Sequence, residues 1–182
     1  DLLLKVMEEP PEGVLFLLTA DSLAGVLPTI RSRCVSFAIA PVSPADCARY
    51  CTAHGVDKKT AALYSELFDG HIGTVLTAAR DKARTEQVDK AMELARAAQA
   101  GDSYTAAVLL APYEKDKAGA AALLRDLRAV AAAGLQGSPH APVQGQQAQR
   151  TLRLAEAAIQ RLGAQVNPKI VLTVFAARLA HA

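Results

Sequence analysis

Aromatic side chains are scarce in this sequence of 182 residues: they make up 4% of it, and tryptophan is absent. Apolar residues as a whole reach 51%, so a substantial core is available, and it must be built mainly from aliphatic side chains. Alanine-rich stretches such as 118–124 and 129–133 favour helix, because alanine loses no side-chain entropy there. The composition therefore predicts a mostly α protein.

The sequence also lacks a large excess of charge of one sign, long hydrophobic runs and an even number of cysteines. The net charge of +2 is too small to argue by itself for nucleic-acid binding. No window approaches the roughly 18 uninterrupted apolar residues that a membrane span needs, so we expect no membrane partner. Three cysteines in a chain rich in helix formers are typical of a reduced, cytoplasmic protein rather than of a disulfide scaffold.

Residues 1–40 have the pattern of an α/β segment. A first helix ends at Glu8-Glu9-Pro10-Pro11, because a proline disfavours helix at the residue before it. Val14–Leu18 is an uninterrupted apolar run of strand length, typical of a strand buried on both faces of a parallel sheet. Val35–Ile39 alternates with period two and predicts a second, shorter strand. Since the sequence opens inside an amphipathic pattern, we expect a larger N-terminal part to precede it.

Helical patterns fill the rest of the chain. Residues 41–82 predict three short helices, the first starting at Ser43-Pro44 and the second ending at Gly70. Residues 83–182 predict a helical bundle, interrupted by a Gly/Pro/Gln-rich loop over 134–147 that we expect to be mobile. After the loop, apolar residues repeat at alternating spacings of 4 and 3, as in a heptad seam: Ala148, Leu152, Ala155, Ile159 and Leu162.

Three stretches within residues 1–40 carry a more specific signal. They are Leu3–Pro11 (Leu-Leu-Lys-Val-Met-Glu-Glu-Pro-Pro), Phe16–Thr19 (Phe-Leu-Leu-Thr) and Leu27–Cys34 (Leu-Pro-Thr-Ile-Arg-Ser-Arg-Cys). Taken singly, each is ordinary: the prolines end a helix, the apolar run is a core strand, and an exposed arginine is a solvated charge. In this order and spacing they closely resemble the clamp-loader branch of the AAA+ ATPases. In that family a helix ending in a Leu-Glu-Glu-Pro-Pro-like sequence precedes a core strand and a Ser-Arg-Cys motif.

The resemblance implies an organisation of the chain and a set of partners. Residues 1–40 would be the C-terminal end of an AAA+ ATPase core, 41–82 a three-helix lid, and 83–182 a helical collar that joins subunits into a ring. The expected fold class is thus mostly α, with the end of an α/β core. In this family five subunits, among them gamma/tau and delta, form a heteropentamer that opens the sliding clamp and places it on primed DNA. The complex belongs to the DNA polymerase III holoenzyme, a nucleotidyltransferase.

In the family, the arginine of Ser-Arg-Cys is an arginine finger, and the matching residue here is Arg33. A guanidinium is always charged and presents a planar fork of donors. Acting in trans on ATP bound by the adjacent subunit, it would stabilise the charge that develops on the γ-phosphate. Ser32 and Cys34 would position the turn, with Cys34 as packing rather than as a reactive thiol. Arg31 is a weaker candidate for the same surface, and a solvated charge explains it equally well.

Two further positions decide which type of subunit the sequence resembles. Motor subunits of the family carry a sensor threonine after the core strand and a sensor arginine in a Gly-x-x-Arg sequence of the lid. Here these positions fall on Ala20, next to Thr19, and on Gly73. The sequence also contains no Gly-rich phosphate loop with a lysine, so we expect no ATPase activity and no cofactor in this chain. The resemblance is to the delta-prime type; the alternatives are a gamma/tau motor subunit and an unrelated helical adaptor.

A metal site is a weaker interpretation of the lid sequence. Cys47, Cys51 and His54 fall on one predicted helical face, but zinc takes four ligands and no fourth Cys or His lies nearby. Thiols packed on the inner face of a helix explain the pattern better, so we expect no metal. The zinc-binding cysteine cluster of the family would lie upstream of residue 1. His71 is expected in a turn that caps a helix rather than at a nucleotide.

Overall fold

Helices dominate this computed structural model, which describes residues 2–20, 22–164 and 166–180. Within these ranges it contains ten α-helices, two short 3-10 helices and no strand. The mostly α class expected from the composition is therefore confirmed. None of the described helices is long and apolar enough to cross a membrane. The chain divides into two compact units, residues 1–40 and residues 41–182.

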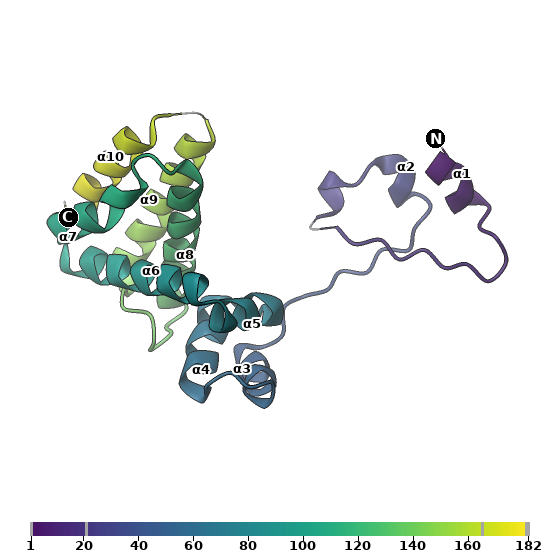
Figure 1. Ribbon diagram of the computed structural model, residues 1–182, viewed down its shortest axis with the longest axis horizontal. Helices are drawn as coiled ribbons and strands as arrows, with labels where there is room; N and C mark the ends of the chain where they lie inside the picture. The colour runs from purple at the N-terminus through teal and green to yellow at the C-terminus, as the bar shows by residue number, and fades with distance from the viewer. Residues whose placement is uncertain (1, 21, 165, 181–182) are drawn as a thin grey trace. The chain divides into compact units, whose positions relative to one another are not determined.

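The first unit consists of short helical segments joined by irregular chain (Figure 1). The helical segments are α1 (Leu2–Glu8), the 3-10 helix η1 (Leu23–Gly25) and α2 (Pro28–Arg31). The first helix ends before the paired prolines, as predicted. No side chain described in this unit is buried, so its local structure depends on short-range contacts rather than on a core.

The two strands predicted in this unit are absent, and that prediction is wrong. Val14–Leu18 and Val35–Ile39 have no regular secondary structure, and Leu17 and Ile39 are 86% and 97% exposed. A strand is held by hydrogen bonds to a neighbouring strand, and even an isolated pair is marginal in water. No described segment pairs with either run. Without a partner, the apolar pattern does not produce a strand, and the expected α/β character is missing from the described residues.

Three short helices begin the second unit: α3 (Pro44–Ala53), α4 (Lys58–Leu67) and α5 (Ile72–Arg80). Ser43 caps the first of them, since its Oγ accepts the Asp46 N–H at 3.1 Å. Gly70 follows α4 with a φ of +73°, and a Cβ there would lie 1.7 Å from the Val42 carbonyl oxygen. The three helices pack on one another around buried side chains from each: Cys47, Cys51, Ala61, Tyr64, Val75 and Ala78.

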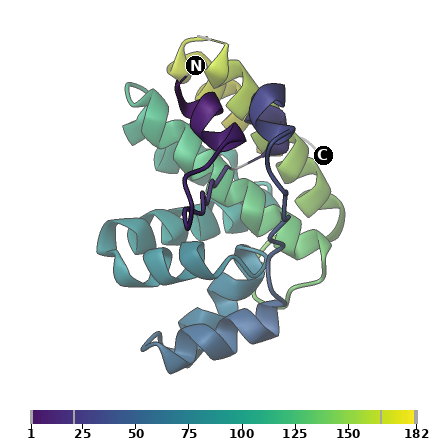
Figure 2. The ribbon, with the colours of Figure 1, turned by 90° about the vertical axis from the view of Figure 1, so that its right-hand side faces the viewer.

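The remaining helices form a bundle in the same unit: α6 (Lys82–Ala100), α7 (Ser103–Leu110), the 3-10 helix η2 (Ala111–Tyr113), α8 (Lys117–Leu135), α9 (Gly145–Gly163) and α10 (Pro168–Ala180). Helices α8 and α9 lie side by side, and α6 packs against α8 (Figures 1 and 2). Aspartate side chains cap the starts of α6, α7 and α8, at Asp81, Asp102 and Asp116. The largest fully buried side chains are aliphatic, as the scarcity of aromatics predicts: Leu94, Leu110, Leu123, Leu124, Leu127 and Leu162.

The heptad-like seam predicted after the loop lies on α9 and faces the core. Ala148, Ala155 and Leu162 are buried, while Leu152 and Ile159 are half-buried and pack against the core. The seam is therefore confirmed as the packing face of α9, with Leu152 and Ile159 at its edge.

The Gly/Pro/Gln-rich segment between α8 and α9, which we expected to be mobile, makes specific contacts with α8 and within itself. Val143 is fully buried, and its carbonyl oxygen lies so close to Gly134 that a Cβ there would come within 1.9 Å of it. Gln144 Nε2 donates hydrogen bonds to the carbonyl oxygens of Ser138 at 2.8 Å and Ala141 at 2.9 Å. The loop thus closes the α8–α9 pair through a direct backbone contact with α8.

A polar cluster joins the three-helix group to the bundle. Both Nη groups of Arg84, on α6, donate to the carboxylate of Asp126, on α8, and Gln87 Nε2 donates to the same carboxylate at 2.6 Å. The guanidinium carbon lies 5.6 Å from the ring centroid of Phe68, at the end of α4. The hydrogen bonds with Asp126 raise the pKa of Arg84 above its usual value. The cluster connects α4, α6 and α8 within residues 41–182.

Candidate functional site

Ser32-Arg33-Cys34 forms a tight turn at the end of α2. Pro28 occupies the first helical position, where its missing N–H leaves no hydrogen bond unmade. The Ser32 N–H donates to the Pro28 carbonyl oxygen at 3.0 Å, and the Arg33 N–H donates to that of Ile30 at 3.1 Å. Ile30 and Cys34 are half-buried, whereas Ser32 and Arg33 lie at the surface. The turn therefore presents Arg33 outward from a short, locally stabilised helix.

The guanidinium of Arg33 contacts two parts of the first unit. Its Nη1 donates to the Thr29 carbonyl oxygen at 2.6 Å and to Ser32 Oγ at 3.3 Å. Its Nε donates to Glu8 Oε1 at 2.7 Å, and its Nη2 forms an ion pair with the same oxygen. The Arg33 side chain is 30% exposed and that of Glu8 49%. Arg33 is thus held at the surface between the end of α1 and the backbone of α2.

The neighbours of Arg33 in the motif differ in what they do. Ser32 Oγ donates to the Thr29 carbonyl oxygen at 3.1 Å and also accepts from Arg33, so it lies directly against the guanidinium. Cys34 is a free, half-buried thiol. Arg31 is exposed and has no side-chain hydrogen bond or ion pair with any described residue. Of the motif's flanking side chains, only Ser32 contacts the guanidinium.

The two positions aligned with sensor residues carry no group that binds phosphate. Ala20 is exposed in the irregular chain of the first unit. Gly73 is the second residue of α5, and no heavy atom beyond its chain neighbours and its own helix lies within 4 Å of the place where a Cβ would stand. A side chain at this position would therefore fit without a clash. The glycine at Gly73 is not imposed by packing.

Cys47 and Cys51 lie in the core, whereas the imidazole ring of His54 lies at the surface. Both thiols are fully buried on the inner face of α3, as predicted. Burial is the main cause that raises the pKa of Cys51 to about 11, and Cys47 adds to it. The His54 ring stacks on Tyr50 with centroids 4.0 Å apart, and its Nδ1 lies 2.8 Å from the Tyr50 carbonyl oxygen. Within the described ranges no three His, Cys, Asp or Glu side chains are grouped so as to hold a metal ion.

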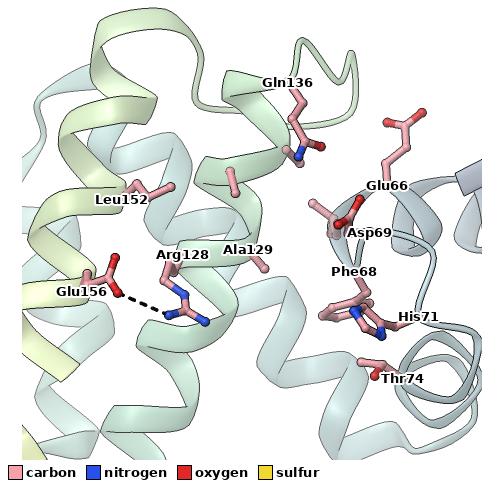
Figure 3. A pocket seen from close by; sticks show the side chains of 13 residues that line it. Glu66, Phe68, Asp69, His71, Thr74, Arg128, Ala129, Gln136, Leu152 and Glu156 are labelled. Carbon is pink, nitrogen blue, oxygen red and sulfur yellow. Dashed lines mark ion pairs between the residues drawn. The ribbon is translucent and has the colours of Figure 1, made fainter. Parts of the chain in front are cut away.

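A pocket of about 490 Å³ lies within the second unit, between the α4–α5 turn and helices α8 and α9 (Figure 3). Phe68, Asp69 and His71 lie along one wall, and Arg128 and Glu156 along the opposite wall. The sequence offered no signal for this pocket, because its walls come from segments far apart in the chain. Of its lining, His71 is the residue that the sequence analysis considers for ligand contact, and it does lie in the turn that precedes α5.

The charges of this pocket disfavour an anionic ligand. Arg128 is the only lining residue with a permanent positive charge, and its Nη1 lies 3.7 Å from Glu156 Oε1. Asp69 and Glu66 add two further carboxylates to the lining. A phosphate group would therefore meet more negative than positive charge here. The pocket is a poor candidate for a nucleotide site, and the turn that carries the Ser32-Arg33-Cys34 motif is the candidate functional site.

Residues 1–43 match the family model described as "DNA polymerase III, delta subunit". The match covers the Glu-Glu-Pro-Pro sequence and the whole Ser32-Arg33-Cys34 turn. It supports a DNA polymerase III clamp-loader-type subunit. A clamp-loader role in DNA replication, in a complex with other subunits, is supported on the same ground. Neither the curated proteins nor the solved structures contain a match to this chain.

Sequence reasoning missed the residues that hold the arginine. The sequence indicates for Glu8 only a place at a helix end, and it indicates no role for Thr29. The contact between Glu8 and Arg33 spans 25 positions of sequence, and no periodicity links them. The Thr29 carbonyl contact was within reach of sequence reasoning, because a helix end leaves its last carbonyl oxygens without partners inside the helix.

Proposed function

We propose that this chain is a clamp-loader subunit of the delta-prime type, a stator that lends Arg33 in trans to ATP bound by a neighbouring subunit. The observation that carries the proposal is the Ser32-Arg33-Cys34 turn. It lies inside the residues that match the family, and it presents a guanidinium at the surface of a short helix. The proposed activity is support of ATP hydrolysis during loading of the sliding clamp onto primed DNA.

The proposed mechanism needs only charge and geometry from this chain. As the γ-phosphate is transferred to water, negative charge is spread over its oxygens, and a guanidinium fork placed against them stabilises that charge. Ser32 supports the finger through its contact with the guanidinium, and Cys34 supports the turn by packing. The chain itself holds no cofactor in this proposal, and the ATP belongs to the neighbouring subunit.

The delta-prime type is favoured over a gamma/tau motor by the two sensor positions. Neither Ala20 nor Gly73 can donate a hydrogen bond from its side chain to a phosphate. The open space beside Gly73 gives this argument weight, because a larger residue would be accepted there. The gamma/tau motor subunit remains the alternative. An intact Gly-x-x-x-x-Gly-Lys-Ser/Thr loop in the full-length protein would favour it.

The second unit would supply the contacts with partner subunits. In the proposal, residues 41–82 form the lid and residues 83–182 the collar of a heteropentamer with gamma/tau and delta. Helices α7 and α10 pack against each other, and each also leaves large apolar side chains exposed. Their apolar side chains are spread around each helix rather than gathered in one stripe, which is typical of helices covered by further protein. The exposed set consists of Tyr104, Val108, Ile170 and Val174.

The test is the ATPase activity of a reconstituted clamp loader that contains either the wild-type chain or Arg33→Ala. With clamp and primed DNA present, hydrolysis at the site facing Arg33 should fall by about 10³–10⁵, the range that an arginine finger contributes. Clamp loading should fall with it. Arg33→Lys should restore little, because an ammonium group lacks the planar fork.

Two comparisons make the result specific. Arg31→Ala removes a neighbouring exposed charge of the same sign and should leave the ATPase rate unchanged. Size-exclusion chromatography should show that both variants enter the complex as the wild type does. Full ATPase activity of the Arg33→Ala complex would overturn the finger assignment. Failure of the wild-type chain to join the other subunits would instead favour the unrelated helical adaptor.

A further inference from the structure

The donors of Arg33 are almost fully engaged in the chain as described. An arginine side chain has five N–H donors. Nη1 has two acceptors in the Thr29 carbonyl oxygen and Ser32 Oγ, while Nε and Nη2 each donate to Glu8 Oε1. Four contacts leave one N–H, on Nη2, without an acceptor. The edge formed by Nε and Nη2, which can grip an oxyanion with two parallel hydrogen bonds, is occupied by Glu8.

This arrangement is incompatible with a finger that grips phosphate with two donors. One remaining N–H provides a single hydrogen bond, whereas recognition of a phosphate by arginine is commonly bidentate. The contacts with Thr29 and Ser32 come from the turn itself and hold the Nη1 end of the guanidinium. The contact with Glu8 comes from another helix and can be lost without changing the turn. Glu8 is therefore the contact that has to be released.

We propose that Glu8 is a latch: its carboxylate holds the Arg33 guanidinium until the γ-phosphate of the neighbouring subunit's ATP replaces it. This inference rests on the proposed function, since it assumes that Arg33 meets a phosphate. Before the exchange, Glu8 neutralises the charge of Arg33 and keeps it from other anions. After the exchange, the carboxylate returns to water, to which it is already 49% exposed.

The latch is weak enough to open. Ion pairs that are this exposed contribute about 0.2–1 kcal/mol, equivalent to a 1.4- to 5-fold preference for the closed state. A γ-phosphate carries more charge than a carboxylate and lies where a subunit interface excludes water, so it competes successfully. The latch would therefore lower the fraction of Arg33 that is free to bind phosphate by a small factor, and it would not prevent binding.

Neighbouring carboxylates provide a matched control. Glu9 follows Glu8 directly, is exposed, and has no side-chain hydrogen bond or ion pair with any described residue. Glu9→Gln changes the net charge of the same segment by the same amount as Glu8→Gln, without touching Arg33. A difference between the two variants is therefore due to the contact between Glu8 and Arg33 and not to the change in net charge.

The experiment measures the ATP concentration for half-maximal hydrolysis by the reconstituted clamp loader with clamp and primed DNA. Glu8→Gln and Glu8→Ala should lower this concentration about 1.4- to 5-fold, and Glu9→Gln should not. The gain should shrink at high salt, because exposed pairs are screened. In the Arg33→Ala background the Glu8 substitutions should have no effect.

The outcomes separate the latch from the proposed function. If Arg33→Ala leaves hydrolysis unchanged, the finger itself is wrong. If Arg33→Ala abolishes hydrolysis at its site while Glu8→Gln and Glu8→Ala are neutral or require more ATP, the finger stands and the latch is overturned. The latter pattern would mean that Glu8 supports Arg33 in its working position.

Discussion

Replacing Asp126 by asparagine should destabilise the protein more than the removal of a carboxylate at any other contact described here. Asp126 is 5% exposed and accepts hydrogen bonds from Arg84 and from Gln87. Asparagine keeps the size of the side chain but removes its charge and turns an NH₂ group toward the guanidinium. Arg84 is then left partly buried without a counter-charge, while its contact with the Phe68 ring remains.

The expected loss follows from the burial of the two partners. Removing one member of a buried ion pair costs about 3–5 kcal/mol. The Arg84 side chain is 25% exposed and can regain some hydration, so we expect a smaller loss of about 2–3 kcal/mol in the free energy of unfolding. For a chain of this size, that corresponds to a fall of about 4–12 °C in Tm.

Urea unfolding of the full chain, followed by far-ultraviolet circular dichroism, measures this loss. The control is Glu156→Gln, which breaks a pair with Arg128, also on α8, but between side chains that are 46% and 50% exposed. That change should cost less than about 0.5 kcal/mol. Replacing Arg84 and Asp126 together by Met and Leu should recover most of the lost stability. Equal effects of Asp126→Asn and Glu156→Gln would refute the idea that this cluster holds the second unit together.

Three further predictions concern the second unit. Gly134→Ala should lower the free energy of unfolding by about 1–3 kcal/mol, because the new Cβ would clash with the Val143 carbonyl oxygen. Gly73→Ala should be neutral or stabilising, because the space beside Gly73 is open. The midpoints of urea unfolding compare the two variants. The pKa of Cys51 is raised to about 11 from 9.0, so the stability it contributes is complete below pH 9 and is lost as the pH rises toward 11. The urea midpoint should fall more steeply over this window in the wild type than in Cys51→Ala. Tyr104→Ser should leave Tm nearly unchanged, because the side chain is 78% exposed, and should weaken entry into the clamp loader by size-exclusion chromatography.

The helical part of the fold was predictable because its signals are local. Helix starts depend on a cap and a first-turn proline, as at Ser43-Pro44, and the seam from Ala148 to Leu162 follows from spacing alone. The strands at Val14–Leu18 and Val35–Ile39 were not predictable in this way. A strand depends on a partner that the apolar pattern does not specify, and none of the described segments provides one.

The packing of the loop between α8 and α9 and the pocket of Figure 3 show a second limit of sequence reasoning. Glycine, proline and glutamine in the loop indicate turns, but they do not reveal that Val143 is buried against Gly134. The pocket has Phe68 on the wall opposite α8, and the Arg84–Asp126 cluster joins positions 42 apart in sequence. These contacts result from how helices pack, which depends on the whole set of buried side chains.

The same contrast explains why the Ser32-Arg33-Cys34 turn could be recognised from sequence while its contact with Glu8 could not. The turn that presents Arg33 is built from neighbours: Pro28 starts the helix, and the Thr29 carbonyl oxygen and Ser32 Oγ anchor the guanidinium. Such a turn needs no core, which fits a unit without a buried side chain among its described residues. Glu8 reaches the guanidinium from a separate helix. A locally built turn whose arginine has a distant, weak partner can keep its shape while the arginine changes what it binds, which is what the proposed exchange between a carboxylate and a phosphate requires.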